Sequence, residues 1–183
     1  MHRQALIDAL LNYRTLHPDE TATADQFLDF VRNHPDCFER TLGIGHITGS
    51  AWIVDESGEN ILLTHHRKLD RWLQLGGHAD GDSDVLAVAF KEACEESGLT
   101  TFEAALPDIL DIDIHPIPAR HHEPEHLHYD VRYALRATGG TDFVVSDESY
   151  DLAWVALDDL CTFTQEASMI RMRDKWVAHL AKA

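Results

Sequence analysis

The stretch GHADGDSDVLAVAFKEACEESGL, residues 77–99, decides how this chain folds and where its chemistry lies. Three carboxylates, Glu92, Glu95 and Glu96, stand close together near its end. Residues three and four positions apart share one face of a helix, so these side chains repel one another unless a cation neutralises them. Hard divalent cations such as Mg²⁺ take oxygen ligands, commonly one or two carboxylates together with substrate phosphates. The stretch therefore predicts a metal site on a helix.

Residues around the carboxylates predict both ends of that helix. The N-cap candidates are Asp82, Ser83 and Asp84, and Gly98 stands where a left-handed C-terminal residue is expected. An apolar stripe at helical spacing indicates the face turned to the core; it comprises Val85, Val88, Ala89 and Ala93. Because the glycine pair at 76–77 allows close backbone approach, the Gly77 carbonyl is a candidate further metal ligand.

In this register the stretch resembles the signature of the Nudix hydrolase family, which reads Gly, five residues, Glu, seven residues, Arg-Glu, an apolar residue, any residue, Glu-Glu, any residue, Gly and an apolar residue. The matching residues are Gly77, Glu92, Glu95, Glu96, Gly98 and Leu99, with Ala93 at the apolar position. Ser83 replaces the first Glu and Lys91 replaces the Arg. The resemblance implies that these two positions brace the loop, helix and loop, and Asp82 or Asp84 is a candidate partner for Lys91. A solvated acidic helix face is the alternative reading, but it leaves the glycines in register unexplained.

The resemblance implies a metal-dependent hydrolase. Mg²⁺ or Mn²⁺ would be held by Gly77, Glu92, Glu95 and Glu96 and would assist cleavage of a phosphoanhydride bond. The implied substrate is a nucleoside diphosphate linked to another moiety, such as a nucleotide sugar, a dinucleotide or a nucleoside triphosphate. Glu92 or Glu95 would be the catalytic base, with a histidine-rich loop as the alternative. Two other functions stay open: a catalytically silent module that binds a nucleotide or metabolite, and an isomerase of an isoprenoid diphosphate.

Composition and charge limit the classes of partner. The 183 residues are 44% hydrophobic and 26% charged, which is typical of a globular domain with a substantial core. A formal net charge of −17 disfavours binding to a nucleic-acid polymer but is compatible with a small phosphorylated substrate carried with a metal. The three cysteines are widely spaced and form no CxxC pair, so we expect reduced thiols and a cytoplasmic location. Neither a signal peptide nor a membrane span is expected.

The hydrophobic pattern divides the chain into a helical N-terminal extension, residues 1–40, and a Nudix hydrolase domain, residues 41–183. In the extension, Thr23 and Gln26 predict a capping box for a second helix, which Pro35 would end. Strands are predicted over residues 46–55, 61–66, 71–77, 108–117, 127–137 and 151–157, the first two as a hairpin. A C-terminal helix carries the apolar stripe Met169, Met172, Trp176 and Leu180.

These elements predict an α/β (α+β) fold class, and the resemblance implies its form, a Nudix-like αβα sandwich around a mixed β-sheet. The N-terminal helical extension lies outside that core. We expect it to cover the sheet or, in a homodimer, a partner subunit.

Several side chains outside the acidic helix are candidates for substrate binding. Arg67 and Lys68 follow a predicted strand; arginine binds phosphate bidentately and lysine binds it as a point charge. Arg132, in a later strand, is a third candidate for stabilising phosphate charge. Trp72 is a candidate for stacking on a base, with burial in the core as the alternative. Glu148 is a candidate distal carboxylate.

Histidines gather between the fourth and fifth of these predicted strands. His126 and His128 share one face of a strand, because side chains alternate with a period of two. They are candidates for substrate contact, for general-base work or for binding a transition metal, and a solvated loop is the alternative. The same loop contains His121 and His122, which belong to the histidine cluster considered for metal binding. It also contains Glu123 and Glu125, which are candidates for substrate contact or general-base work.

Overall fold

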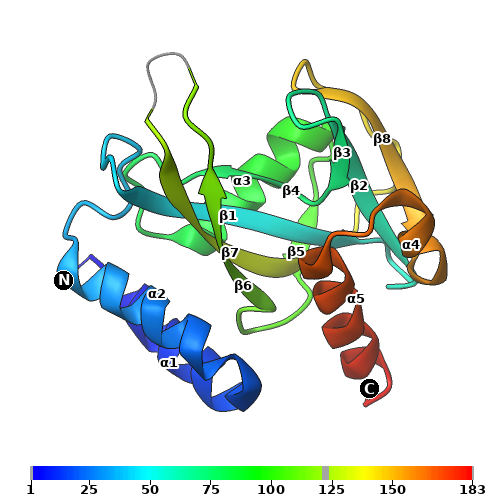
Figure 1. Ribbon diagram of the computed structural model, residues 1–183. Coiled ribbons are helices and arrows are strands. Elements are labelled where there is room, and N and C mark those ends of the chain that lie inside the picture. The colour runs from blue at the N-terminus through cyan, green and yellow to red at the C-terminus, as the bar shows by residue number, and fades with distance from the viewer. Residues whose placement is uncertain (1, 121–123, 183) are drawn as a thin grey trace.

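The computed structural model describes residues 2–120 and 124–182, which form one mixed sheet with helices on both faces (Figure 1). The strands are β1 (Gly45–Val54), β2 (Asn60–His66), β3 (Arg71–Leu73), β4 (Leu75–His78), β5 (Phe102–Ala104), β6 (Asp111–Ile117), β7 (His126–Ala137) and β8 (Ser149–Ala156). The helices are α1 (Gln4–Leu16), α2 (Thr21–Asn33), α3 (Val85–Ser97), α4 (Leu160–Phe163) and α5 (Ala167–Leu180), with 3₁₀ turns at Pro18–Glu20 and Leu157–Asp159.

Strands β1 and β7 form the centre of the sheet and run parallel. Their register extends from Gly45 opposite Leu127 to Val54 opposite Arg136. The other pairings described are antiparallel: β2 and β4 pair with β1, β5 and β6 pair with β7, and β3 and β8 pair with β2. The mixed sheet and the β1–β2 hairpin agree with the prediction from the sequence.

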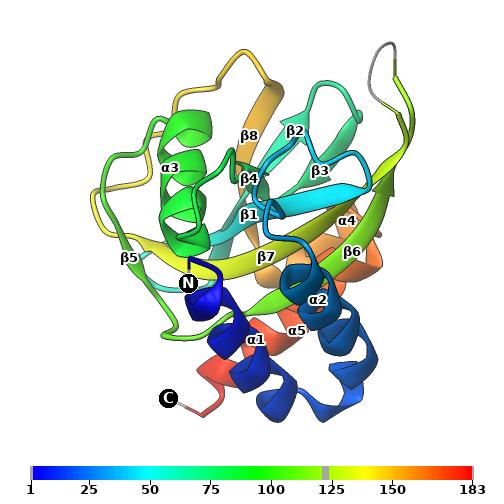
Figure 2. The same ribbon diagram turned by 90° about the vertical axis from the view of Figure 1, so that its left-hand side faces the viewer.

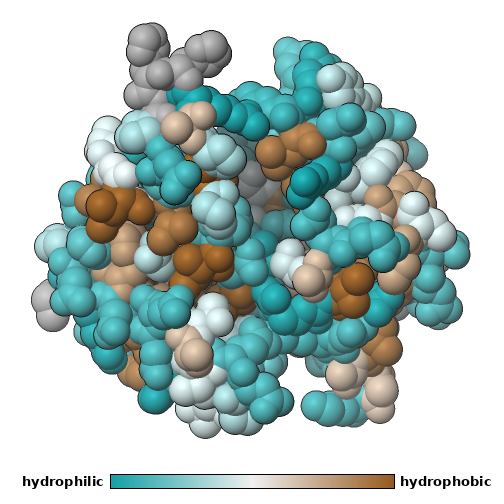
Figure 3. All heavy atoms as spheres, in the orientation of Figure 1, coloured by the Kyte–Doolittle hydropathy of each residue, from teal (hydrophilic) through white to brown (hydrophobic). Residues whose placement is uncertain are grey.

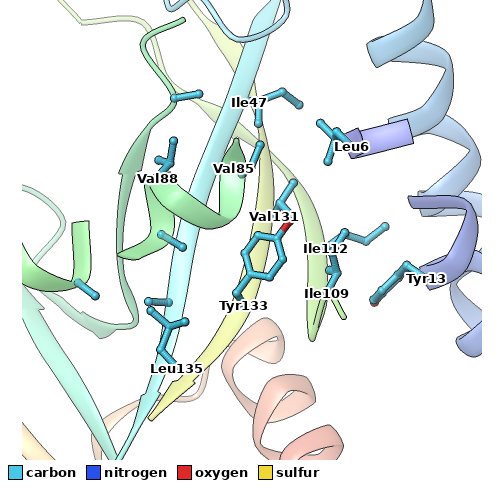
Figure 4. Packing of buried hydrophobic residues seen from close by; sticks show 14 of the residues in the cluster. Leu6, Tyr13, Ile47, Val85, Val88, Ile109, Ile112, Val131, Tyr133 and Leu135 are labelled. Carbon is cyan, nitrogen blue, oxygen red and sulfur yellow. The ribbon is translucent and has the colours of Figure 1, made fainter. Parts of the chain in front are cut away.

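Two apolar clusters fill the two faces of the sheet, with α3 on one side and α5 on the other (Figure 2). The first cluster joins α1, α2 and α3 to the strands. Figure 4 shows Leu6 and Tyr13 of α1 pointing toward the sheet, where Tyr13 lies opposite Ile112 of β6 and Ile109 just before it; all four side chains are buried. The second cluster contains the predicted C-terminal stripe, in which Met169, Met172 and Trp176 are buried and Leu180 is partly buried. The N-terminal helices therefore cover apolar surface of the sheet.

Helix α2 begins earlier than the sequence indicated. It starts at Thr21, directly after the 3₁₀ turn, and Glu20 at the N-cap position makes no side-chain capping hydrogen bond. Thr23 and Gln26 lie inside the helix, so the prediction of a capping box there is wrong. The end of α2 at Asn33, shortly before Pro35, is as predicted.

Hydrophilic side chains dominate the face of the molecule shown in Figure 3, where hydrophobic atoms form separate patches. Among the described residues, no helix has the length and apolar character needed to cross a membrane.

Candidate active site

Helix α3 has the boundaries that its sequence predicts. Asp84 is the N-cap, and its Oδ1 accepts a hydrogen bond from the Ala87 N–H at 3.1 Å. Gly98 is the left-handed C-cap, with φ +70°, and its N–H donates to the Cys94 carbonyl at 2.9 Å. The stripe Val85, Val88, Ala89 and Ala93 is buried against the sheet. This docking fixes the direction in which the carboxylates on the neighbouring face of α3 point.

Two of those carboxylates lie directly against the glycines of β4. The Gly76 N–H donates to Glu96 Oε1 at 2.8 Å. A Cβ added to Gly77 would lie 2.5 Å from the Glu92 carboxyl group, a separation that no real side chain tolerates. Glycine is therefore required at Gly77 for Glu92 to occupy its place, which is the close approach that the sequence predicted.

Burial perturbs both carboxyl groups. Glu96 is 7% exposed, and burial, together with the nearby charges of Glu92 and Glu148, raises its pKa to about 8 despite the hydrogen bond from Gly76. Burial likewise raises the pKa of Glu92, where the Lys91 ammonium opposes the shift. Glu148, the predicted distal carboxylate, is close enough for its charge to act on both groups. Strongly perturbed carboxyl groups that cluster in this way mark a candidate functional site.

Glu95 lies apart from this pair. Its side chain is 61% exposed and lies 3.8 Å from Lys91 Nζ, which also approaches Glu92 at 3.4 Å. Asp84 instead caps α3, and Asp82 accepts a hydrogen bond from the Asp84 N–H. The partners of Lys91 are thus the glutamates of α3, and the pairing considered with Asp82 or Asp84 is not formed.

This donor set fits a divalent cation. Glu92 and Glu96 bring two carboxyl groups, buried or half-buried, to a backbone that carries no side chain at Gly76 and Gly77. Repulsion from neighbouring carboxylates helps to raise both pKa values, and a bound divalent cation would relieve it. Members of the family that this helix resembles generally use divalent metals.

Arg67 and Lys68 lie at the end of β2, next to Glu148. The Arg67 N–H donates to the Glu148 carbonyl at 3.0 Å, and Nη2 of Arg67 donates to the Ser149 carbonyl at 3.0 Å. The guanidinium also stands 5.3 Å from the ring centroid of Tyr150. Both basic side chains are exposed. The structure thus places two exposed cationic groups beside Glu148, the predicted distal carboxylate.

Arg132 is placed differently from the prediction. It is 3% exposed, and its guanidinium donates to Asp130 at 2.6 Å and to Asp111 at 3.1 Å. These buried ion pairs occupy the side chain, which argues against its contacting a substrate phosphate. Trp72 is half-buried and stacks on His65 with ring centroids 5.0 Å apart, which fits the packing alternative better than an open stacking platform.

His126 and His128 belong to a histidine cluster on the sheet face away from α3. Sequence reasoning missed the other members, which are His46 on β1, His78 on β4 and His115 on β6. Burial lowers the pKa of His46 to about 4 and that of His128 further, so both imidazoles are neutral. Glu125 is exposed, and the candidates His121, His122 and Glu123 lie outside the described residues.

Comparison with protein-family models matches residues 46–180 to the NUDIX domain. The match covers most of the chain, so the fold and the acidic helix together define an enzyme domain of the pyrophosphohydrolase class. The chain belongs to the Nudix family, as its resemblance to the signature predicted. No protein of curated function matched the sequence.

The solved structures of similar fold include enzymes with several different named activities. The Ap4A hydrolase of C. elegans, in a binary complex, superposes with a TM-score of 0.59 at 18% identity over 74% of this chain and 99% of that chain. The dihydroneopterin triphosphate pyrophosphohydrolase of E. coli superposes with a TM-score of 0.57 at 12% identity, over 72% of this chain and 95% of that chain. An ADP-ribose pyrophosphatase of Streptococcus suis superposes with a TM-score of 0.50 at 23% identity, over 70% of this chain and 89% of that chain. At these identities the likeness concerns the fold alone.

Proposed function

We propose that this protein is a metal-dependent hydrolase of a phosphoanhydride bond in a nucleoside diphosphate linked to another moiety. The observation that carries the proposal is the pair Glu92 and Glu96, held against the side-chain-free backbone of Gly76 and Gly77. In a Nudix fold this pair forms a compact oxygen-donor site next to exposed cationic side chains. Oxygen donors of this kind suit Mg²⁺ or Mn²⁺.

The residues proposed to hold the cation are Glu92 and Glu96, with Glu95 and the Gly77 carbonyl as further ligands. When bound, Mg²⁺ or Mn²⁺ polarises phosphoryl oxygens and lowers the pKa of an attacking water. Glu96 is the most buried of the three glutamates of α3, so its role is to anchor the site. Glu95 is exposed and lies at the rim of the site, where water reaches it.

Two carboxylates qualify as the proton acceptor. Glu92 has a raised pKa, which makes it the stronger base, and Glu95 is freely accessible to water. A Glu92→Gln variant that also loses metal affinity would assign Glu92 to the metal, whereas a Glu95→Gln variant that binds metal normally but turns over slowly would assign the base to Glu95.

Arg67 and Lys68 are proposed to bind the substrate phosphates, because both are exposed and Arg67 adjoins Glu148 through its backbone. Bidentate contacts from a guanidinium would also stabilise charge that develops on the phosphates. His126 and His128, the other predicted substrate contacts, lie on the sheet face away from α3, so we do not propose them as contacts to a substrate at the carboxylate site. The strongly acidic composition, with a net charge of −17, favours a small metal-accompanied substrate over a nucleic-acid polymer.

The described cysteines Cys37, Cys94 and Cys161 are all free, which supports our proposal of a reducing, cytoplasmic compartment. A homodimer is a further proposal, which sedimentation of the purified chain tests directly. We also propose that residues 1–40 are an extension added to a Nudix hydrolase domain at residues 41–183.

The decisive experiment measures nucleotide or phosphate release from nucleotide sugars, dinucleotides, dinucleoside polyphosphates and nucleoside triphosphates, with Mg²⁺, with Mn²⁺ and with chelator. We expect metal-dependent cleavage of one substrate class. Glu92→Gln and Glu96→Gln should abolish it while circular dichroism shows an intact fold, and Glu56→Gln, on the exposed turn after β1, serves as the matched control.

Full activity in both active-site variants would refute the proposed site. Binding without turnover across the panel would instead identify the protein as a catalytically silent nucleotide-binding module. An isomerised product from an isoprenoid diphosphate would identify it as an isomerase.

A further inference from the structure

Five histidines meet at one end of the sheet, on the face opposite α3. The members of this histidine cluster are His46, His78, His115, His126 and His128. They come from β1, β4, β6 and β7, four strands that are far apart in sequence. None of them takes part in the carboxylate site described above.

Strand register explains how the cluster forms. His46 on β1 is directly opposite His128 on β7, and His128 is in turn directly opposite His115 on β6. Directly opposed residues on paired strands point to the same face. His78 on β4 is opposite Thr48, two residues along β1 from His46, and so it also points to this face.

Three of these side chains converge on one point. One ring nitrogen from each of His46, His78 and His128 lies within 4.8 Å of the others. The ring centroids of these three histidines are 4.9 to 5.0 Å apart. A tetrahedral Zn²⁺ with bonds of about 2.05 Å places its ligand nitrogens about 3.4 Å apart, so modest side-chain rotations bring the three into coordination.

Two members of this cluster, His46 and His128, have buried ring nitrogens without a hydrogen-bond partner among the described residues. Within the described part of the chain, both ring nitrogens of His46 and Nε2 of His128 are buried and make no hydrogen bond. Buried polar atoms are nearly always hydrogen-bonded, so each exception calls for an explanation such as a bound ion. Here three such nitrogens belong to two directly opposed residues, His46 and His128.

In the two remaining histidines, His115 and His126, Nδ1 has a hydrogen-bond partner. The Nδ1–H of His126 donates to the Pro124 carbonyl at 2.9 Å, which leaves Nε2 as the lone-pair nitrogen. The Nδ1 atom of His115 is 3.0 Å from Asp113 Oδ2. A carboxylate or carbonyl that fixes the tautomer of an imidazole is the typical outer-shell partner of a metal-binding histidine.

We propose that His46, His78 and His128 bind a divalent transition-metal ion of the Zn²⁺ type, with His115, His126 or water in the remaining position. Neutral imidazoles suit such ions, whereas Mg²⁺ prefers oxygen donors. This metal centre is separate from the carboxylate site: Gly77 faces Glu92, and the next residue, His78, points to the opposite face of β4. One short strand thus lies between two sites of different donor chemistry.

The test uses the full chain without a polyhistidine tag, stripped with chelator and then titrated with Zn²⁺ in the presence of saturating Mg²⁺. We expect one Zn²⁺ per chain. Substitution by Co²⁺ should give the intense visible absorption of a tetrahedral site with nitrogen ligands. Changes in outer-shell partners commonly cost 10–100-fold in metal affinity, so loss of a ligand in His46→Gln or His128→Gln should weaken Zn²⁺ binding at least ~100-fold.

Matched controls separate the two sites. His179→Gln, on α5, should leave Zn²⁺ affinity unchanged, and so should the Glu92→Gln, Glu96→Gln double variant. Zn²⁺ binding that follows the glutamates, or that survives both histidine substitutions, would overturn the proposal. If the histidine variants fail to fold, X-ray absorption at the zinc edge of the wild-type protein decides the matter: imidazole scattering supports the site and an oxygen-only shell refutes it.

Discussion

Burial raises the pKa of the Glu96 carboxyl group, so the stability of the metal-free protein should depend on pH. The folded pKa is about 8, well above the ordinary value of 4.5. Between these pH values the folded state holds a proton that the unfolded state has lost. The free energy of unfolding should therefore fall as pH rises from about 5 to 8, by up to a few kcal/mol. Urea denaturation in chelator at several pH values measures this slope.

The Glu96→Gln variant isolates the contribution of this carboxyl group. Glutamine does not ionise, so the slope of stability against pH should flatten in the variant. Excess Mg²⁺ should also reduce the slope in the wild type, because a cation favours the charged carboxylate. An unchanged slope in Glu96→Gln would assign the pH dependence to other groups.

Gly77→Ala tests the close approach of β4 to α3. The new Cβ would lie 2.5 Å from the Glu92 carboxyl group, so Glu92 must move. Because a small misplacement of a catalytic group is costly, we expect kcat/KM to fall ~100-fold. Gly43→Ala is the control, since nothing lies within 4 Å of its added Cβ. Equal activity in the two variants would show that the position of Glu92 is not critical.

At the scale of single elements, the capping of α3 should be measurable on its own. Asp84→Ala removes the acceptor for the Ala87 N–H and should lower the free energy of unfolding by about 1 kcal/mol. Asp29→Ala, at an exposed position in the interior of α2, should change it by less than about 0.5 kcal/mol. Thermal denaturation of both variants provides the comparison; equal losses would argue against a capping role.

The sequence predicted the elements best where the pattern was long and local. Strands β1 and β7 and helices α3 and α5 were found because periodicity, caps and glycines within each segment agree. The sequence did not predict β5, because a strand of three residues is too short to show an alternating pattern. The stretch at 71–77 was predicted as one strand, whereas β3 pairs with β2 and β4 with β1, so the chain changes neighbours at Gln74.

At the scale of the whole molecule, a buried ion-pair network links the sheet to the terminal helices. Asp111 is fully buried and accepts hydrogen bonds from Arg132, from Arg171 at 2.8 Å and from Lys175 at 2.6 Å. Nζ of Lys175 also donates to the hydroxyl group of Tyr13 in α1. The network thus connects α1, β6, β7 and α5.

Asp111→Asn should be strongly destabilising, because it leaves the buried guanidinium of Arg132 with less opposing charge. Removing one partner of a buried ion pair typically costs 3–5 kcal/mol, so we expect a loss of about that size in urea denaturation. Asp174→Asn breaks an exposed pair with Arg173 and should cost about 0–1 kcal/mol. Similar effects in the two variants would contradict the structural role of Asp111.

The two candidate sites differ in how far the sequence alone predicts them. Glu92 and Glu96 are four residues apart on one helix, so it follows from helical geometry that they share a face. His46, His78 and His128 converge only through the pairing of β1 with β7 and β4, which no local pattern encodes. The prediction for Arg132 misses its burial for the same reason: alternation along β7 does not reveal that Asp111 and Asp130 enclose the guanidinium.

The parallel pairing of β1 with β7 also has a kinetic consequence. Directly paired residues such as Thr48 and Asp130 are separated by 82 positions, so this contact forms only after a long loop has closed. Non-local pairing of this kind slows folding. During synthesis, α1, α2 and the β1–β2 hairpin leave the ribosome before β7 is made, with the apolar surface that β7 covers still exposed to water. The newly made chain should therefore depend on chaperones more than a helical bundle of equal length.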